Sequence, residues 1–379
     1  MKTNYFFLIS FALFLSISSF SQTLINASFT NQSYLRTYSI YVPAIYNPSV
    51  PVPLVLNLHG YGSNNAQQLV YADFRPIADT ADFILVCPNG TVAPTNSTYW
   101  NCFDVPGGVN DVTFISALID TISAHYSIDP HRIYSTGMSN GGYMSYELAS
   151  QLSYRLTAIA SVAGDMLYGH MNSCHPLHPF PVMQIHGTAD GTVVYAGDTY
   201  SEPIDSLVNF WVDFNHCNPV PVVTNLPNID TTDGCTVEHY VYNGGDSSST
   251  VEFYKVIGGD HSWPGAPLNI NTTDMDFSAS KEIWRFFSQY RLTQLSDGIA
   301  ESPMEISIPA YPNPSNGNFT LKFTDADEKT ISVTNSLGQV VQTLKCSEDY
   351  MNLYLEMPGI YFVTVHEGTK MYSQKLIRN

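Results

Sequence analysis

Basic residues are scarce in this chain of 379 residues, which carries 15 Lys and Arg against 33 Asp and Glu. A protein that binds nucleic acid or an anionic membrane surface needs clustered Lys and Arg, so the net charge of −18 argues against both kinds of partner. Charged residues of all types make up 13% of the chain and hydrophobic residues 44%, a balance typical of a folded protein and not of a disordered one.

Long apolar runs are absent beyond the first residues. Residues 1–21 combine Lys2, an apolar run over 6–17 and small residues up to Ser21, which is the pattern of a secretory signal peptide. The apolar run is too short to span a bilayer comfortably, and no stop-transfer charges follow it. We therefore expect cleavage before Gln22 and no membrane span in the mature chain.

Cysteine is also infrequent, and the six that occur fit export to an oxidising compartment. Cys217 and Cys235 flank a loop rich in Pro, Asn, Asp and Thr, which predicts a disulfide that would stabilise the fold by about 3 kcal/mol. The pairing of the other four stays open: Cys87, Cys102, Cys174 and Cys346. No spacing is typical of a zinc site, so we expect no metal.

Strand and helix patterns alternate along most of the chain. Strand patterns cover 34–42, 53–58, 83–87, 132–136, 156–163, 181–185 and 251–257, and helix patterns cover 111–125, 142–152 and 278–290. Asn110 is placed to cap the first of these helices, and the strand at 34–42 alternates like an edge strand. The alternation predicts a mainly parallel sheet with helices on both faces, and ligands collect beyond the carboxyl ends of such strands.

Residues 137–141, Gly-Met-Ser-Asn-Gly, match the pattern G-x-S-x-G between a strand and a helix. That context is typical of a nucleophile elbow, in which a tight turn exposes the serine hydroxyl above the sheet. The turn requires small residues two positions away on each side of the serine, which glycine supplies. The pattern therefore predicts that Ser139 is a catalytic nucleophile.

A serine nucleophile needs a general base and a carboxylate that orients it. Asp190 and His261 follow the next strands, and the chain order Ser, Asp, His is that of the α/β-hydrolase fold. We predict Ser139 as nucleophile, His261 as base and then acid, and Asp190 as the orienting carboxylate. Asp165 also follows a strand and is the alternative acid. Two other histidines at strand ends precede glycines and are expected to be structural: His59 and His186.

The loop at 59–62, His-Gly-Tyr-Gly, follows the first long strand, where the second oxyanion donor of this fold is expected. We therefore predict that the backbone N–H groups of Tyr61 and Asn140 form the oxyanion hole. Trp100 and Trp263 lie in loops near these motifs and are candidates to line the substrate pocket; packing within the loops is the alternative.

The pattern of predicted secondary structure changes near residue 297. A linker over 296–307 leads to short alternating strands with turn signals over 308–379, which predicts a small antiparallel β-sandwich. This segment contains no group that suggests chemistry.

The segments LHGYG (58–62), GMSNGGYM (137–144), HGTAD (186–190) and GGDHSWPG (258–265) resemble secreted esterases of the polyhydroxybutyrate depolymerase and feruloyl/acetylxylan esterase group, which is related to carbohydrate esterase family one. The resemblance covers roughly 34–290 and implies an α/β-hydrolase domain over 22–295. It also implies the same triad and carboxylic-ester hydrolysis without a cofactor. One departure is Asp260, where many relatives have glycine.

The tail at 308–379 resembles the C-terminal sorting domain of the type IX secretion system. The motifs are Tyr-Pro-Asn-Pro (311–314), Ser-Leu-Gly-Gln (336–339), Gly-Ile-Tyr-Phe-Val (359–363) and a basic end. This resemblance implies a Gram-negative bacterial enzyme that the type IX machinery carries to the cell surface or the medium.

The expected function is a secreted serine esterase that acts on feruloyl or acetyl esters of plant polysaccharide. The alternative is a poly(3-hydroxybutyrate) depolymerase with the same triad, and a third hypothesis is a non-catalytic surface adhesin on the same fold. The choice of substrate, expected to be a polymer, depends on loops at 91–109 and 191–235.

Overall fold

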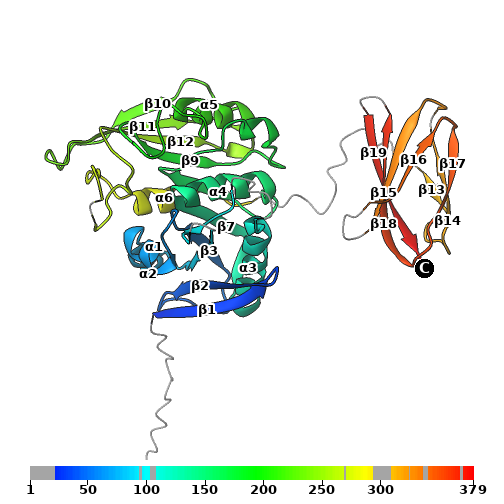
Figure 1. Ribbon diagram of the computed structural model, residues 1–379, viewed down its shortest axis with the longest axis horizontal. Helices are drawn as coiled ribbons and strands as arrows, with labels where there is room; N and C mark the ends of the chain where they lie inside the picture. Colours follow the sequence, from blue (N-terminus) through cyan, green and yellow to red (C-terminus); the bar gives the residue numbers. More distant parts are fainter. Residues whose placement is uncertain are drawn as a thin grey trace, which may run out of the picture. The chain divides into compact units, whose positions relative to one another are not determined.

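The computed structural model describes residues 22–93, 96–102, 108–268, 270–292, 309–323, 325–335, 340–367 and 370–379. The chain divides into two compact units, residues 1–294 and 295–379, drawn from blue to yellow and from orange to red in Figure 1. The signal peptide expected at 1–21 and the linker expected at 296–307 lie outside the described residues.

The first unit is built on a ten-stranded sheet with the order β1-β2-β4-β3-β7-β8-β9-β12-β11-β10 (Figure 1). The strands are β1 (Thr23–Asn31), β2 (Tyr34–Val42), β3 (Val52–Leu58), β4 (Ile84–Pro88), β7 (Ile128–Met138), β8 (Ala158–Val162), β9 (Val182–Gly187), β10 (Val222–Asn225), β11 (Thr236–Tyr242) and β12 (Val251–Ile257). The central strands from β4 to β12 pair in parallel, and those at both margins pair antiparallel. The prediction of a mainly parallel sheet is confirmed.

Helices cover both faces of this sheet, because successive strand residues point to opposite sides. In β3, Leu54 and Leu56 belong to one apolar core and Val55 to another. The first core includes residues of α3 (Asp111–His125), α4 (Asn140–Gln151) and α5 (Ile204–Phe214), and the second includes residues of α1 (Asn65–Tyr71), α2 (Arg75–Ala81) and α6 (Ala279–Phe287). No helix in the described parts of the chain is long and apolar enough to cross a membrane.

Several elements lie where the sequence suggested loops or gave no signal. β1 pairs along the whole of β2, so β2 is not an edge strand as its alternation suggested. The segment 191–235, expected as loop, contains α5 and β10. A short hairpin of β5 (Thr91–Val92) and β6 (Thr98–Tyr99) lies in the other expected loop, beside the sheet's carboxyl edge.

The second unit consists of two small antiparallel sheets, ordered β13-β14-β17 and β16-β15-β18-β19. The strands are β13 (Ala310–Tyr311), β14 (Asn318–Lys322), β15 (Lys329–Asn335), β16 (Val340–Cys346), β17 (Tyr350–Tyr354), β18 (Gly359–Glu367) and β19 (Lys370–Arg378). Its own apolar core includes Phe319, Ile331 and Val363. This arrangement agrees with the expected small β-module.

Candidate active site

The turn at Ser139 joins the end of β7 directly to the start of α4. Ser139 has φ 55° and ψ −121°, a region that residues with side chains rarely adopt. The turn is so tight that the residues two positions before and after Ser139 must be glycines. A Cβ on Gly141 would lie 2.3 Å from the carbonyl oxygen of Leu58, and one on Gly137 would lie 2.5 Å from the backbone of Gly141. The strand–turn–helix geometry therefore has the form expected of a nucleophile elbow.

Asp190 and His261 meet beyond the carboxyl ends of the adjacent parallel strands β9 and β12. The Nδ1 atom of His261 lies 2.8 Å from Asp190 Oδ2. The other carboxylate oxygen, Oδ1, accepts hydrogen bonds from the backbone N–H groups of Thr192 and Val193, each at 2.8 Å. Both oxygens of this buried carboxylate are thus held by donors, which fixes its orientation toward the imidazole.

These donors also determine the charge of Asp190. Burial by itself would raise the pKa of the carboxyl, but the hydrogen bond and charge of His261 and the nearby His186 outweigh it and leave the pKa below its usual value. An ionised Asp190 accepts the Nδ1–H of His261, so Nε2 is left to receive a proton.

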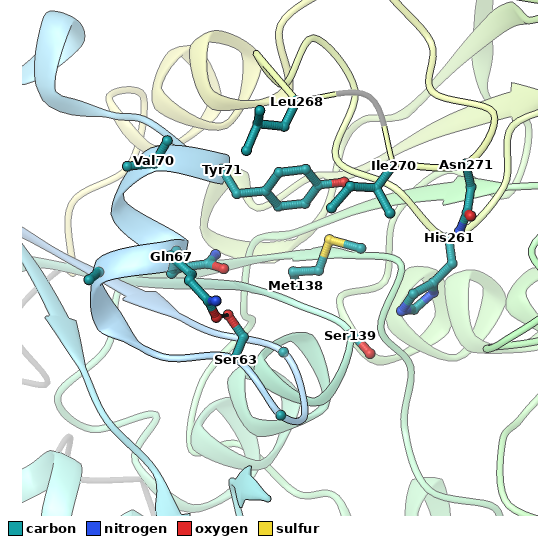
Figure 2. A pocket seen from close by; sticks show the side chains of 14 residues that line it. Ser63, Gln67, Val70, Tyr71, Met138, Ser139, His261, Leu268, Ile270 and Asn271 are labelled. Atoms are coloured by element: carbon teal, nitrogen blue, oxygen red, sulfur yellow. Dashed lines mark hydrogen bonds between the residues drawn. The ribbon is translucent and has the colours of Figure 1, made fainter.

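Ser139 and His261 line the same cavity, which has a volume of about 650 Å³. Figure 2 shows the Ser139 hydroxyl and the His261 imidazole at one end of it, with an apolar wall opposite them. The wall is formed by side chains from α1, from the end of β7 and from the loop after β12: Val70, Tyr71, Met138, Leu268 and Ile270. Three polar side chains also line the cavity, namely Ser63, Gln67 and Asn271, and Figure 2 shows Asn271 beside His261.

The alternative residues for the triad have other partners. Asp165 is fully buried, its Oδ1 accepts a hydrogen bond from the backbone N–H of Met166 at 2.6 Å, and burial raises its pKa to about 8. His59 is bound through Nε2 by the N–H of Gly90 at 3.0 Å, and His186 contacts the Val193 carbonyl oxygen at 2.8 Å. Both histidines are buried, as expected for structural residues.

The predicted oxyanion residues flank the cavity. Gly60 and Gly62 of the loop after β3 line it, so the intervening Tyr61 backbone lies beside the site, while the Tyr61 side chain is exposed. Asn140 is the first residue of α4, where backbone N–H groups lack intrahelical partners. Its buried side chain accepts a hydrogen bond from the Trp100 N–H at 2.7 Å and donates one to the Trp100 carbonyl at 3.1 Å.

The suggestion that Trp100 and Trp263 line the substrate pocket is wrong, because both side chains are buried in the core. The Trp100 indole donates a hydrogen bond to the His59 carbonyl oxygen at 2.9 Å and stacks near Phe114. The Trp263 indole donates to Ser280 Oγ at 3.2 Å. An indole without exposed surface cannot form a platform for a substrate. Trp100 instead connects the loop after β3 to the start of α4.

A buried ion pair that the sequence did not indicate fixes the segment next to Trp100. Arg36 on β2 contacts Asp111 Oδ1 at 2.6 Å, and Asp111 Oδ2 accepts the backbone N–H of Asn101 at 2.8 Å. Asp111 also starts α3, so the pair joins the sheet, a helix and the segment beside the active site. No local sequence signal could find it, because its partners lie far apart in the chain.

The predicted disulfide between Cys217 and Cys235 is wrong, since both thiols are free. Cys217 belongs to the apolar core on one face of the sheet and Cys235 to the core on the other face. The sheet therefore separates them. The remaining cysteines are free and buried as well: Cys87, Cys102, Cys174 and Cys346.

Two protein families match the chain. Residues 36–198 match the family described as esterase PHB depolymerase, and residues 309–379 match the secretion system C-terminal sorting domain. The first match includes the elbow and Asp190. The second covers the strands of the small β-unit, and it supports a secreted or cell-surface location reached through the type IX machinery.

Similar proteins are carboxylic ester hydrolases by name. The bifunctional acetylxylan esterase/xylanase of Neocallimastix patriciarum is 26% identical over 67% of this chain, and the match spans only 33% of that relative's length. Feruloyl esterase D of Neurospora crassa is 26% identical over 67% of this chain and 82% of its own. The structure of an acetyl xylan esterase from Aspergillus awamori shares the fold, with a TM-score of 0.51, 14% identity and coverage of 70% of this chain and 99% of its own. Residues 36–198 therefore match the PHB depolymerase esterase family, the similar proteins are carboxylic ester hydrolases by name, and residues 309–379 match a secretion system C-terminal sorting domain.

Proposed function

We propose that the protein is a secreted serine carboxylic-ester hydrolase with a Ser139–His261–Asp190 triad and an acyl-enzyme intermediate. The observation that carries this proposal is the 2.8 Å contact between His261 Nδ1 and Asp190 Oδ2, with Ser139 in the cavity that His261 also lines. Acyl transfer by serine requires an imidazole that a carboxylate keeps in the correct orientation, next to an exposed serine hydroxyl.

In the proposed reaction, Nε2 of His261 takes the proton of the Ser139 hydroxyl as its oxygen attacks the ester carbonyl carbon. Asp190 keeps the Nδ1–H in place and stabilises the imidazolium that forms. His261 then gives the proton to the leaving alcohol, which departs and leaves an ester between the acyl group and Ser139. Water, deprotonated by His261, then attacks that ester; the bond to the Ser139 oxygen breaks, His261 returns the proton to this oxygen, and the acid is released.

Charge develops on the carbonyl oxygen during both steps. The N–H groups of Asn140 and Tyr61 are the proposed donors to it, the first because it opens α4 directly after the nucleophile. Removing one such donor typically costs about 10²–10³-fold in rate. The paired hydrogen bonds between Asn140 and Trp100 hold the start of the helix in position for this task.

The proposed substrates are feruloyl or acetyl esters on plant polysaccharide. Tyr71, Met138 and Ile270 give the cavity an apolar wall, and about 650 Å³ is ample for an aromatic acyl group. The polar Gln67 and Asn271 could hydrogen-bond a phenol, a methoxy group or a sugar hydroxyl. The net charge of −18 is compatible with a neutral polymer.

A second candidate is hydrolysis of poly(3-hydroxybutyrate), an aliphatic polyester. The observation that favours it is the apolar rim of the cavity, where Val70, Leu268 and Ile270 are all exposed although they are large and hydrophobic. Exposed apolar side chains that surround a catalytic cleft are suited to contact a hydrophobic solid.

Hydrolysis of methyl ferulate, acetylated xylan and a polyhydroxybutyrate suspension by the purified protein, measured side by side, tests the proposal. We expect release of ferulate or acetate without clearing of the suspension. Clearing of the suspension alone would identify a depolymerase. Inactivity on all three and on p-nitrophenyl acetate would contradict ester hydrolysis and favour a non-catalytic adhesin on this fold.

A further inference from the structure

Away from the active site, two loops bring acidic side chains together. Asp233 lies in the loop between β10 and β11, and Asp274 lies in the long loop between β12 and α6 (Figure 1). One ligand atom from each of these residues and the Cys235 thiol lie within 4.8 Å of one another. Asp276 lies two residues beyond Asp274 and adds a third carboxylate nearby.

Backbone N–H groups order these carboxylates. Asp233 Oδ2 accepts a hydrogen bond from the Met275 N–H at 2.7 Å, which ties one loop to the other. In the opposite direction, Asp276 Oδ1 accepts the N–H groups of Ile229 at 2.5 Å and Asp230 at 2.8 Å. The side chains are therefore held in fixed positions and do not move freely as on an exposed acidic surface.

Two of these carboxylate oxygens accept no hydrogen bond from the described residues. Asp274 is fully buried, and among the described residues no donor reaches its Oδ2 or the buried Oδ2 of Asp276. Likewise, within that part of the chain no Lys or Arg forms an ion pair with Asp233, Asp274 or Asp276. A buried carboxylate without a donor or a counter-charge is costly, and burial together with the Asp276 charge raises the pKa of Asp274 to about 7.

We propose that Asp233 and Asp274 bind a divalent cation of the Ca²⁺ type, with Asp276 adding negative charge beside it. Carboxylate oxygens are the ligands that hard cations prefer, and backbone carbonyls and water complete the usual six to eight ligands. The single Cys235 thiol does not make a zinc site, since zinc sites in proteins generally combine several thiol or imidazole ligands.

The cation has a structural role in the loop that also carries His261. The loop that carries His261 is tied to itself by two hydrogen bonds, from the Asp260 N–H to the Thr272 carbonyl at 2.9 Å and from the Gly265 N–H to the Asp274 carbonyl at 2.8 Å. A cation on Asp274 and Asp233 would join this loop to the one before β11. The proposal does not depend on ester hydrolysis.

Thermal unfolding of the purified full chain tests the site. After treatment with a chelator and its removal, CaCl₂ at a hundredfold excess over the dissociation constant, about 10–100 mM, should raise the midpoint by about 5–10 °C. Extracellular calcium sites commonly have dissociation constants of about 10⁻⁴–10⁻³ M, so the titration spans that range. Hydrogen exchange should slow at 229–235 and 260–276 when CaCl₂ is added.

Two variants should lose the response to CaCl₂, Asp274→Asn and Asp233→Asn, while Asp213→Asn, an exposed aspartate on α5, should keep it. The absence of any CaCl₂ effect on the wild-type midpoint would overturn the proposal even if a variant failed to fold. A response to ZnCl₂ but not to CaCl₂ would overturn the calcium assignment, and an undiminished CaCl₂ response in both variants would place the cation elsewhere.

Discussion

The Nδ1 atom of His261 lies 2.8 Å from Oδ2 of Asp190, and the Oδ1 of that carboxylate accepts two backbone N–H groups. A neutral amide at this position would present an N–H where the imidazole needs an acceptor, and the wrong tautomer would result. Asp190→Asn should therefore lower kcat for p-nitrophenyl acetate by about 10³–10⁴-fold. Asp165→Asn is the matched control, because Asp165 hydrogen-bonds Met166, and it should retain nearly wild-type kcat. A reversed order of effects would make Asp165 the orienting acid.

The buried Asp165 should make stability depend on pH. Burial raises its pKa from 3.8 to about 8, so the folded state favours the protonated carboxyl. This contribution to stability is complete below pH 4 and is lost as the pH rises toward 8, by up to about 1.4 kcal/mol per pH unit. Urea unfolding at pH 5 and pH 8 should show a smaller pH-dependent loss for Asp165→Asn than for the wild type. Identical pH profiles of the two proteins would refute this assignment.

The Arg36–Asp111 pair should be important for stability, because both side chains are buried. Removal of one partner leaves an uncompensated buried charge, which costs about 3–5 kcal/mol. Asp111→Ala should lower the free energy of unfolding in urea by that amount. Asp120→Ala on the same helix is the control, since Asp120 is 70% exposed where it meets Arg155, and it should cost under about 1 kcal/mol. Equal losses in both variants would contradict a special role for the buried pair.

The C-terminal unit should be needed for export but not for catalysis. It has its own apolar core and matches a sorting domain, whereas the proposed triad lies wholly in the first unit. Deletion of residues 300–379 should leave kcat and KM for p-nitrophenyl acetate unchanged and abolish appearance of the protein outside a type IX-secreting host. If the deletion instead spared export and weakened binding to xylan, the unit would be a substrate-binding module.

Local signals predicted much of the fold. The helix at Asp111–His125 agrees with its expected range because the Asn110 side chain caps it, accepting the Thr113 N–H at 2.9 Å. The strands at 34–42 and 251–257 also agree with the predicted ranges. Prediction from the sequence was wrong where contacts between distant residues determine the structure. β1 pairs with β2, so β2 is not an edge strand, and α5 lies within a segment that was expected to be a loop.

In the candidate site, too, the sequence predicted some features correctly and others wrongly. Ser139, Asp190 and His261 follow strand ends, and parallel strands bring such residues to one edge of the sheet, so the sequence was sufficient to group them. The tryptophans were misplaced because position in a loop near a motif does not determine burial: Trp100 and Trp263 are core residues. The disulfide was misjudged because loop composition cannot show that a sheet separates two cysteines.

The most direct test of the central claim is turnover of p-nitrophenyl acetate by Ser139→Ala, together with the intact mass of both proteins after brief exposure to the ester. We expect wild type to gain the mass of one acetyl group and the variant to gain none, with turnover reduced by about 10⁴–10⁶-fold and an unchanged circular dichroism spectrum. Turnover near the wild-type rate in a folded Ser139→Ala protein would contradict the acyl-enzyme mechanism and the assignment of the nucleophile.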